Sequence, residues 1–430
     1  MTRALFISAP ASGQGKTLVT AALAWHHRQQ GRRVRIFKTG PDFLDPMILS
    51  SASAHPVGNL DLFMGGEEEC RQQVTTAALD ADLILVEGVM GLFDGTPSSA
   101  DLAALLGLPV LVVMDASAMA QTFGALALGL KNYDARLDFA GVLANRVGSP
   151  RHARLLASSL PASLTWWGSI TRDPALTLPE RHLGLVQAAE LPDLEERLTH
   201  AALALPEALR CFDQLPSLTF PNPAPSAPPE RFLDGLRIAI ARDHAFSFLY
   251  PANLSLLRTL GAQLTFFSPL RGELLPSCDA LWLPGGYPEL HLKSLAAHSH
   301  CMATIRQHHE AGRPILAECG GMTYLAQRLI SKEGDRADLV GLIPGEATVQ
   351  PRLAALGLQS LHTPQGELRG HTFHYSRLET TLPPTTHAQN AQNEEGEAVY
   401  CIDGLTATYL HSYFPSNPRA VAQFFLGNTR

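Results

Sequence analysis

Short apolar runs separated by helical and turn patterns recur along the chain. In the first half, such runs lie at residues 4–8, 33–38, 83–87, 110–114 and 141–144. The stretch 17–30 has the spacing of a helix, and Gly31 follows it, where helices commonly end in a left-handed glycine. Strands that alternate with helices are typical of a parallel sheet covered on both faces. The pattern therefore predicts an α/β fold.

A second α/β pattern begins at residue 236, with strand-like runs at 236–241, 263–267, 280–283 and 314–317. Between the two patterns, the stretch 214–230 holds Pro216, Pro221, Pro223, Pro225, Pro228 and Pro229. Proline fixes φ and removes a backbone donor, so this stretch disfavours helices and central strands. We predict domains at 1–213 and 236–430 joined by a linker at 214–235. The polar stretch 384–398 is predicted to be a surface loop.

Composition narrows the class of protein further. The chain has 430 residues, of which 46% are hydrophobic, and a formal net charge of -7. The length predicts two or three domains, and the negative charge argues against partners such as nucleic acid or an anionic membrane. The start of the chain lacks the pattern of a secretory signal, and the longest apolar stretch, 102–114, is shorter than a membrane span. Six scattered cysteines without a Cys-x-x-Cys pair disfavour disulfides, so we expect a cytoplasmic protein.

Residues 9–17, Ala-Pro-Ala-Ser-Gly-Gln-Gly-Lys-Thr, have the pattern of a phosphate-binding loop. Such a loop joins a strand to a helix and turns backbone N–H groups toward phosphate oxygens. Gly13 and Gly15 supply the flexibility. Lys16 is expected to reach the terminal phosphates, and the Thr17 hydroxyl to bind Mg²⁺. Pro10 stands where the usual pattern has its first glycine. A loop that binds nothing is the alternative, but the Lys-Thr pair and the flanking elements agree with phosphate binding.

Further strands end in loops that place polar side chains at the same edge of the predicted sheet: Lys38, Asp42, Asp45, Glu87, Asp94, Asn145 and Arg146. Ligands of open α/β sheets bind at the carboxyl ends of the strands. Glu87 ends its strand in the manner of a carboxylate that holds Mg²⁺. For any single acid, the alternative is a solvated loop charge. Asn145 and Arg146 are expected to contact the nucleotide base or, equally well, to form a plain turn.

A second kind of chemistry is indicated near the other end of the chain. An apolar strand at 314–317 leads into Glu318-Cys319-Gly320-Gly321, and residues 322–329 have a helical pattern. A strand, a tight turn and a helix would expose the Cys319 sulfur and aim a helix N-terminus at it, which lowers the pKa of a thiol. A buried structural cysteine is the alternative, but it explains neither the turn nor the paired glycines.

A thiol nucleophile needs a base and a site for the oxyanion. His411 follows a short strand, and the loop 283–289 offers glycine amides, provisionally that of Gly286. Because the chain contains 17 histidines, the residues alone leave the choice of base open.

Together these motifs resemble the cobyrinic acid a,c-diamide synthase family, close to its hydrogenobyrinic acid members. The matching blocks lie at 9–17, 37–46, 87–95, 141–147, 178–186, 241–250, 283–289, 317–324, 369–376 and 409–414. Single phosphate-loop patterns are weak evidence. Pro-Glu-Arg-His-Leu-Gly-Leu at 179–185 and Gly-His-Thr-Phe-His-Tyr-Ser at 370–376, combined with the cysteine turn, are highly specific.

The resemblance implies an N-terminal P-loop domain with a parallel sheet similar to dethiobiotin synthetase, and a C-terminal class I glutamine amidotransferase domain with a flavodoxin-like α/β fold. In such families the cysteine attacks glutamine and releases ammonia, with the histidine as base and then acid. ATP and Mg²⁺ convert a corrinoid carboxylate to an acyl phosphate, which ammonia displaces. The family amidates the a and c carboxylates of cobyrinic or hydrogenobyrinic acid in cobalamin biosynthesis.

The resemblance also implies roles for individual residues of this sequence. Cys319 and His411 are the catalytic pair, with Gly286 in the oxyanion hole. ATP-binding residues are Gly13, Gly15, Lys16, Thr17, Lys38 and Asn145, and the Mg²⁺ ligands are Thr17, Glu87 and Asp45. A substrate or acyl-phosphate site comprises Asp42, Phe43, Leu44 and Asp94, and a glutamine site comprises His374 and Tyr375. For His371 and His374, a purely structural role is equally well supported.

One departure from the wider class I pattern concerns the acid of the triad. Tyr413 stands two residues after the histidine, where that acid usually lies, and Glu318 would point away from it on an extended strand. Two other functions remain open: amidation of another tetrapyrrole, such as a nickel sirohydrochlorin, and a partitioning-type switch ATPase with an inactive amidotransferase-like domain. A homodimer is expected from related ATPase domains.

Overall fold

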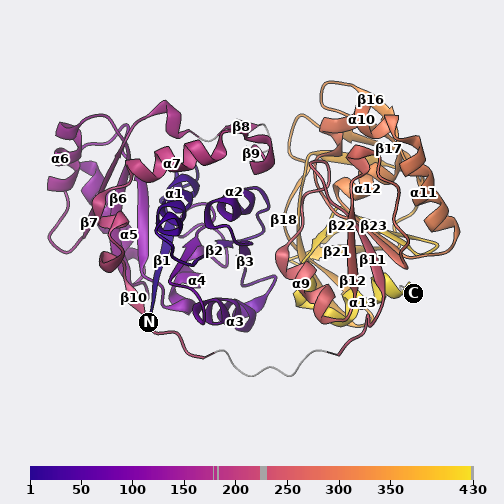
Figure 1. Ribbon diagram of the computed structural model, residues 1–430, viewed down its shortest axis with the longest axis horizontal. Helices are drawn as coiled ribbons and strands as arrows, with labels where there is room; N and C mark the ends of the chain where they lie inside the picture. Colours follow the sequence, from indigo (N-terminus) through magenta and orange to yellow (C-terminus); the bar gives the residue numbers. More distant parts are fainter. Residues whose placement is uncertain (178, 182–183, 223–229, 428–430) are drawn as a thin grey trace. The chain divides into compact units, whose positions relative to one another are not determined.

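The structure is a computed structural model, and it describes residues 1–177, 179–181, 184–222 and 230–427. The chain divides into two compact units, Met1–Pro225 and Ser226–Arg430, which are described separately (Figure 1). The division falls inside the proline-rich stretch. The first part of that stretch is structured, because Ser217–Leu218 form strand β10 and pair antiparallel with Thr2 and Arg3. Leu215 is buried in the core of the first unit.

A parallel sheet forms the centre of the first unit. Its strands are β1 (Thr2–Ser8), β2 (Val34–Thr39), β3 (Gly58–Leu60), β4 (Leu83–Glu87), β5 (Val110–Asp115), β6 (Phe139–Val147) and β7 (Trp166–Thr171). They lie in the order β3-β2-β4-β1-β5-β6-β7, with every neighbouring pair parallel. All side chains from Val110 to Met114 are 0% exposed, as expected for a strand covered on both faces. The α/β prediction is confirmed, although the edge strands β3 and β7 were not predicted.

Helices cover both faces of this sheet. They are α1 (Lys16–Gln29), α2 (Leu44–Ser53), α3 (Gly66–Ala78), α4 (Ser99–Leu106), α5 (Thr122–Tyr133), α6 (Pro150–Ser158), α7 (Leu194–Ala204) and α8 (Glu207–Arg210). One core joins α1, α2 and α7 to the sheet, and a second core joins α3, α4, α5 and α6 to it. Gly31 after α1 has φ 79°, which confirms the predicted helix end. Strands β8 (Glu180–Arg181) and β9 (Gly184–Leu185) form a small hairpin, and residues 178, 182 and 183 of the specific block 178–186 lie outside the described residues.

The order of these strands creates a natural binding edge. β1 lies next to β5, and the chain continues from β1 toward β2 but from β5 toward β6, which lies on the other side. At such a switch point the loops after neighbouring strands separate and leave a crevice at the carboxyl ends. The phosphate loop follows β1 at this point, and the acidic loops follow β2 and β4 next to it.

The second unit contains a mixed sheet. Its parallel part is β12 (Gln263–Phe267), β11 (Arg237–Ala241), β13 (Ala280–Leu283), β14 (Ile315–Glu318) and β23 (Leu405–Thr408), in that spatial order. With β11 counted as the first strand, this is the 2-1-3-4-5 order of flavodoxin-like folds, as predicted. Antiparallel strands extend it through β22 (Glu395–Ile402), β21 (Thr386–Asn390), β18 (Ala355–Thr363), β19 (Gly366–His374) and β24 (His411–Ser412).

Helices and a smaller sheet complete the second unit. The helices are α9 (Pro251–Thr259), α10 (Leu292–Ala297), α11 (Ser299–Glu310), α12 (Gly320–Leu325) and α13 (Pro418–Leu426). The smaller sheet has the order β16-β15-β17-β20, with bounds Arg336–Asp338, Ala326–Ile330, Ile343–Val349 and Ser376–Glu379.

Two local predictions in this unit were wrong. The helix predicted at 322–329 ends at Leu325, and Ala326–Ile330 forms β15, because pairing with β16 and β17 outweighs the helical preference of the sequence. The predicted loop at 384–398 contains β21 and the start of β22. Its polar side chains lie on antiparallel strands whose backbone groups are satisfied by the partner strand, so low hydrophobicity did not prevent strand formation.

Candidate functional sites in the two units

The phosphate loop of the first unit is held from behind by the end of β6. Asn145 Nδ2 donates a hydrogen bond to Gln14 O over 2.9 Å, and Arg146 Nη1 donates to Gly13 O over 3.1 Å. Gly15 has φ 97°, and a Cβ atom added there would lie 2.2 Å from Asn145 Nδ2. Both the backbone conformation and the contact therefore require glycine. The structure places Asn145 against the loop itself.

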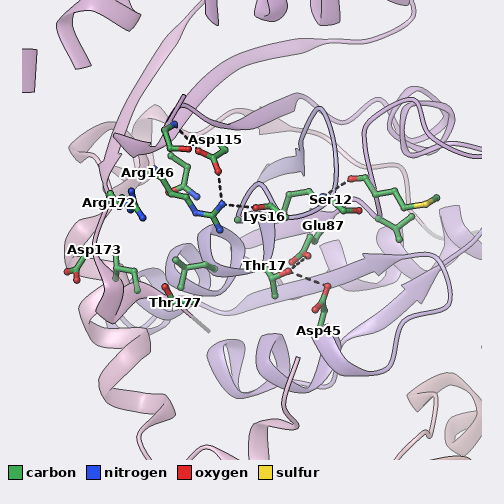
Figure 2. A pocket seen from close by; sticks show the side chains of 18 of the residues that line it. Ser12, Lys16, Thr17, Asp45, Glu87, Asp115, Arg146, Arg172, Asp173 and Thr177 are labelled. Atoms are coloured by element: carbon green, nitrogen blue, oxygen red, sulfur yellow. Dashed lines mark hydrogen bonds and ion pairs between the residues drawn. The ribbon is translucent and has the colours of Figure 1, made fainter. Parts of the chain in front are cut away.

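A cavity of about 680 Å³ opens in front of this loop. Its lining includes nine of the residues predicted for the nucleotide, the metal or the substrate: Gly13, Gly15, Lys16, Thr17, Lys38, Asp42, Asp45, Glu87 and Asn145. Figure 2 shows Lys16, Thr17, Asp45 and Glu87 on one side of the cavity and Asp115, Arg146, Arg172 and Asp173 on the other. The pocket thus has a phosphate end and a second polar end.

Three predicted substrate residues are not in the cavity lining. Phe43 precedes α2 and Leu44 is its first residue. Asp94 accepts a hydrogen bond from Gly91 N over 2.8 Å, which stabilises the turn after β4. Their assignment to the substrate stays a prediction.

Five polar side chains converge at the phosphate end. Thr17 Oγ1 donates to Glu87 Oε1 over 2.7 Å and to Asp45 Oδ2 over 3.3 Å. Lys38 Nζ lies 2.5 Å from Asp45 Oδ2, 2.6 Å from Glu87 Oε1 and 3.7 Å from Asp42 Oδ2. Lys38 and Glu87 are buried, so each charge depends on its neighbours for compensation.

The charges of this cluster shift one another's pKa values. Burial by itself would lower the pKa of Lys38, but Glu87, Asp45 and Asp42 outweigh it and raise that pKa above its usual value. Burial, then the charge of Lys38, lowers the pKa of Lys16 to about 8. Burial, then the charge of Asp45, raises the pKa of Asp42 to about 7. The cluster therefore keeps one buried ammonium among several carboxyl groups.

The donor set at this end fits Mg²⁺. Thr17, Asp45 and Glu87 offer oxygen ligands, and Glu87 Oε2 is buried without a hydrogen-bond partner in the part of the chain that the structure describes. Among the described residues, no group of three or more His, Cys, Asp or Glu side chains has the arrangement of a metal site. Phosphate-loop enzymes, however, complete the shell with phosphate and water oxygens.

The second end of the cavity was only partly predicted. Arg146 Nη1 lies 2.6 Å from Asp115 Oδ2, and the backbone N–H of Asp115 donates to Gln14 Oε1 over 2.7 Å. Arg146 has φ 56°, an uncommon backbone conformation for a residue other than glycine. Asp115 ends β5, so the rule that ligands meet the carboxyl ends of strands could have identified it. Arg172 and Asp173 follow the unpredicted strand β7 and carry no motif.

The second unit contains the predicted cysteine turn. Cys319 lies between β14 and α12 with φ 46° and ψ −106°, a strained backbone for a residue with a side chain. Its N–H donates to Thr408 O over 2.8 Å. A Cβ atom added at Gly320 would lie 2.9 Å from the N and O atoms of Gly286, and one at Gly321 would lie 2.0 Å from Leu283 O. The paired glycines therefore let the turn pack directly on the loop after β13.

The same loop contacts the predicted base. A Cβ atom added at Gly285 would lie 2.3 Å from His411 Cε1, and Gly286 has φ 156°. Cys319 and His411 are 6% and 2% exposed. The structure thus brings the predicted nucleophile, base and oxyanion residue to one loop.

Burial sets the protonation of this pair, and one prediction about it was wrong. Burial, then the charge of Glu289, raises the pKa of the Cys319 thiol above its ordinary value. The helix dipole was expected to lower it, but α12 has only six residues and the surroundings are apolar. Burial, followed by the charges of His371 and His374, lowers the pKa of His411 well below 6.5. The thiol and the imidazole are therefore both neutral at rest.

Two histidines of the block 369–376 lie beside the pair. His371 stacks on His411, with ring centroids 4.9 Å apart, and its Nδ1 is 3.0 Å from Tyr250 Oη. His374 stacks on Tyr409 at 3.7 Å, and its two nitrogens face Ser376 O at 2.7 Å and Glu397 Oε1 at 2.9 Å. A ring that donates from both nitrogens suits these partners.

Other predicted residues have different surroundings. The ring of Tyr375 packs on Phe373, with centroids 6.0 Å apart. Glu318 is buried, and its carboxylate accepts from Ser412 N over 2.8 Å and from Trp282 Nε1 over 3.0 Å. It therefore holds the backbone next to His411. Glu397 was missed because it lies in the polar stretch 384–398, where the sequence gives no signal that separates it from the other acids.

Comparisons with known proteins identify the families of both units. Residues 5–186 match the family described as the CobQ/CobB/MinD/ParA nucleotide binding domain, and residues 237–419 match the CobB/CobQ-like glutamine amidotransferase domain. The chain is 58% identical to the hydrogenobyrinate a,c-diamide synthase of Stutzerimonas stutzeri, over 97% of each chain. It is 56% identical to the protein of the same name from Pseudomonas aeruginosa, over 97% of this chain and 96% of that one. Identity to the cobyrinate a,c-diamide synthase of Herminiimonas arsenicoxydans is 49%, over 98% of this chain and 96% of that one.

Proposed function

Because the chain belongs to the family of cobyrinate and hydrogenobyrinate a,c-diamide synthases, we propose that it amidates the a and c carboxylates of a corrinoid in cobalamin biosynthesis. The reaction uses ATP to activate each carboxylate and glutamine to supply ammonia. One observation carries this proposal: a single chain holds both a phosphate-loop cavity and a cysteine turn that packs on the same loop as His411.

The first unit activates the carboxylate. A carboxylate is a poor acyl donor, and transfer of the terminal phosphoryl group of ATP to it gives an acyl phosphate and ADP. Backbone N–H groups of the loop and the ammonium of Lys16 bind the phosphates, as the geometry of the cavity supports. Ammonia then attacks the acyl carbon and displaces inorganic phosphate. The product is the amide.

Thr17, Asp45 and Glu87 would hold Mg²⁺ beside the phosphates, and the proposal rests on their convergence. A bound Mg²⁺ supplies charge neutralisation for the transferring phosphoryl group. These residues themselves orient one another, since the Thr17 hydroxyl bridges the two carboxylates.

The second unit releases ammonia from glutamine. His411 takes the proton of the Cys319 thiol as the sulfur attacks the side-chain amide of glutamine, and the N–H of Gly286 stabilises the oxyanion. The protonated histidine then gives its proton to the leaving ammonia, and water hydrolyses the thioester to glutamate. His374 and Tyr375 are proposed to hold glutamine, supported in the case of His374 by its position beside Tyr409.

We favour a metal-free corrinoid as the substrate. The two relatives at 58% and 56% identity are hydrogenobyrinate a,c-diamide synthases, whereas the relative at 49% is a cobyrinate a,c-diamide synthase.

Among the residues that the structure describes, no helix is both long and apolar enough to cross a membrane. A cytoplasmic location and a homodimer stay predictions, to be checked by cell fractionation and light scattering.

The deciding experiment is mass spectrometry of hydrogenobyrinic and cobyrinic acids after incubation with the purified protein. Conversion of two carboxylates to amides, dependent on both Mg²⁺–ATP and glutamine, is expected, with hydrogenobyrinic acid converted faster. Unchanged masses of both acids, with ATP still hydrolysed, would overturn the proposal in favour of another tetrapyrrole or a switch ATPase.

A further inference from the structure

The ammonium of Lys38 lies where the proposed metal ligands meet. Lys38 is near the end of β2 and is 2% exposed. Its Nζ donates to Asp45 Oδ2 over 2.5 Å and to Glu87 Oε1 over 2.6 Å. The Thr17 hydroxyl donates to the same two oxygen atoms, over 3.3 Å and 2.7 Å. Two donors therefore converge on one pair of carboxylate oxygens.

Thr17, Asp45 and Glu87 are the residues assigned to Mg²⁺ under the proposed function. Mg²⁺ requires oxygen ligands at about 2.0–2.1 Å in a nearly octahedral shell. It cannot take that position while an ammonium contacts the same Asp45 and Glu87 oxygens, because the two cations would repel each other at close range. The hydroxyl of Thr17 also has to turn, so that a lone pair and not its hydrogen faces the ion.

We propose that Lys38 is a placeholder cation, which occupies the metal position in the nucleotide-free protein and is exchanged for Mg²⁺ when Mg²⁺–ATP binds. The inference rests on the proposed function for the identity of the metal ligands. It adds a role for Lys38 that differs from simple phosphate binding. The lysine keeps the site intact when empty and makes metal binding depend on the nucleotide.

Electrostatics explains why a placeholder is needed. Glu87 is 0% exposed and the side chain of Asp45 is 18% exposed, so without a cation their charges would face each other in a poorly solvated place. The long, flexible side chain of a lysine suits a cation that has to leave its position. Phosphate oxygens of the arriving nucleotide provide the new partner for the ammonium, so displacement costs least when ATP and the metal arrive together.

The other lysine of the cavity serves as a matched control. Lys16 Nζ donates to Ala11 O over 3.3 Å and to Met90 O over 2.6 Å, and thus contacts backbone carbonyls in place of the carboxylates. Removal of Lys16 leaves the placeholder in position. Removal of Lys38 leaves Glu87 and Asp45 without their cation.

Metal binding without nucleotide tests the placeholder directly. Mn²⁺, whose free form is measured by electron paramagnetic resonance, is titrated into the full-length protein and into Lys38→Met. We expect Lys38→Met to bind Mn²⁺ about tenfold more tightly or better, within the usual range of coupling between two sites. Lys16→Met should change the affinity by a much smaller factor. Equal or weaker Mn²⁺ binding by a folded Lys38→Met would overturn the proposal.

A second measurement covers the case in which Lys38→Met does not fold. Lys38→Gln keeps a hydrogen-bond donor without the charge, and it should show the same tighter Mn²⁺ binding. A non-hydrolysable ATP analogue should tighten Mn²⁺ binding more in the wild type than in Lys38→Gln, because only the wild type has an ammonium to relocate. Equal tightening in both proteins would contradict the exchange.

Glu87→Gln separates this inference from the proposed metal site. If Glu87→Gln abolishes Mn²⁺ binding while Lys38→Gln leaves it unchanged, the metal site stands and the placeholder role fails. If Glu87→Gln binds Mn²⁺ as the wild type does, the assignment of the metal ligands itself fails.

Discussion

The two candidate sites handle charge in opposite ways. At the nucleotide site, Lys38 is buried against Asp45 and Glu87, so that charged groups are in place before any substrate arrives. At the thiol site, burial keeps Cys319 and His411 neutral. Phosphoryl transfer benefits from charged side chains that are already in place, because the negative charge of the phosphates is present throughout the reaction. A thiolate is needed only during attack, so that site creates its charge on demand.

Loss of the nucleophile should give the largest effect and separate the two sites most clearly. Cys319→Ala should reduce glutamine-dependent amidation by at least about 10³-fold, since removal of a nucleophile eliminates the covalent step. Amidation with free ammonia should persist, because the activating residues lie in the other unit. Both rates are measured by mass spectrometry of the corrinoid. Cys401→Ala, a half-buried cysteine of the same unit, is the control, and loss of both activities in a folded Cys319→Ala would contradict the division of labour.

A change at the charged site should have the converse result. Glu87→Gln should lower amidation with either nitrogen source by roughly 10²-fold or more, because the site loses the Glu87 carboxylate that is proposed to hold Mg²⁺ beside the phosphates. Glutaminase activity, followed as glutamate release, should persist at least in part. Glu68→Gln, an exposed acid on α3, should change neither rate. Unchanged synthesis by Glu87→Gln would remove Glu87 from the metal site.

A substitution of Glu318 tests which hydrogen bonds position the backbone next to His411 at the thiol site. Glu318→Gln replaces one of two acceptor oxygens by an NH₂ group, which would face the N–H of either Ser412 or Trp282. A buried donor left unsatisfied costs about 1–3 kcal/mol of unfolding free energy. Chemical denaturation measures this cost, and glutaminase activity should fall while ammonia-dependent amidation stays constant.

The same substitution in a Trp282→Phe background supplies the control. That background removes one of the two donors, so Glu318→Gln should cost less there than in the wild type. An equal cost in both backgrounds would show that the two hydrogen bonds do not hold the strand of His411.

The smallest expected effect concerns the pH dependence of thiol reactivity. Because burial raises the pKa of Cys319 above its ordinary value of 9.0, the thiolate fraction stays low at neutral pH. The rate of alkylation by iodoacetamide should rise about tenfold per pH unit and still be rising at about pH 10.5, where an ordinary cysteine has levelled off. The rate is measured by mass spectrometry of the Cys319 peptide. A plateau below about pH 8.5 would show a lowered pKa and a charged thiol site.

Local motifs account for most of what the sequence predicted correctly. The phosphate loop and the cysteine turn each need specific residue types within a few positions, such as Gly15 at φ 97° and Gly320 against the Gly286 backbone. Continuous apolar runs such as Val110–Met114 identified the parallel strands, because burial on both faces leaves little choice of residue.

The predictions failed where distant parts of the chain decide the result. Residues 326–330 form a strand only because β16 and β17 pair with them. The pKa of Cys319 depends on burial by the surrounding core and then on Glu289, neither of which can be inferred from Glu-Cys-Gly-Gly. Glu397 reaches His374 across the sheet from a segment of low hydrophobicity. These features depend on tertiary packing, which a local pattern does not contain.

The contact between Gly15 and Asn145 sets a limit on how the sequence can drift. A methyl group at position 15 would collide with Asn145 Nδ2, and a shorter residue at position 145 would make room for it. The positive φ of Gly15 would still disfavour any side chain there. A change at position 145 alone therefore does not make a larger residue acceptable at position 15. Over evolutionary time, glycine is therefore expected to persist at position 15 whichever residue stands at position 145.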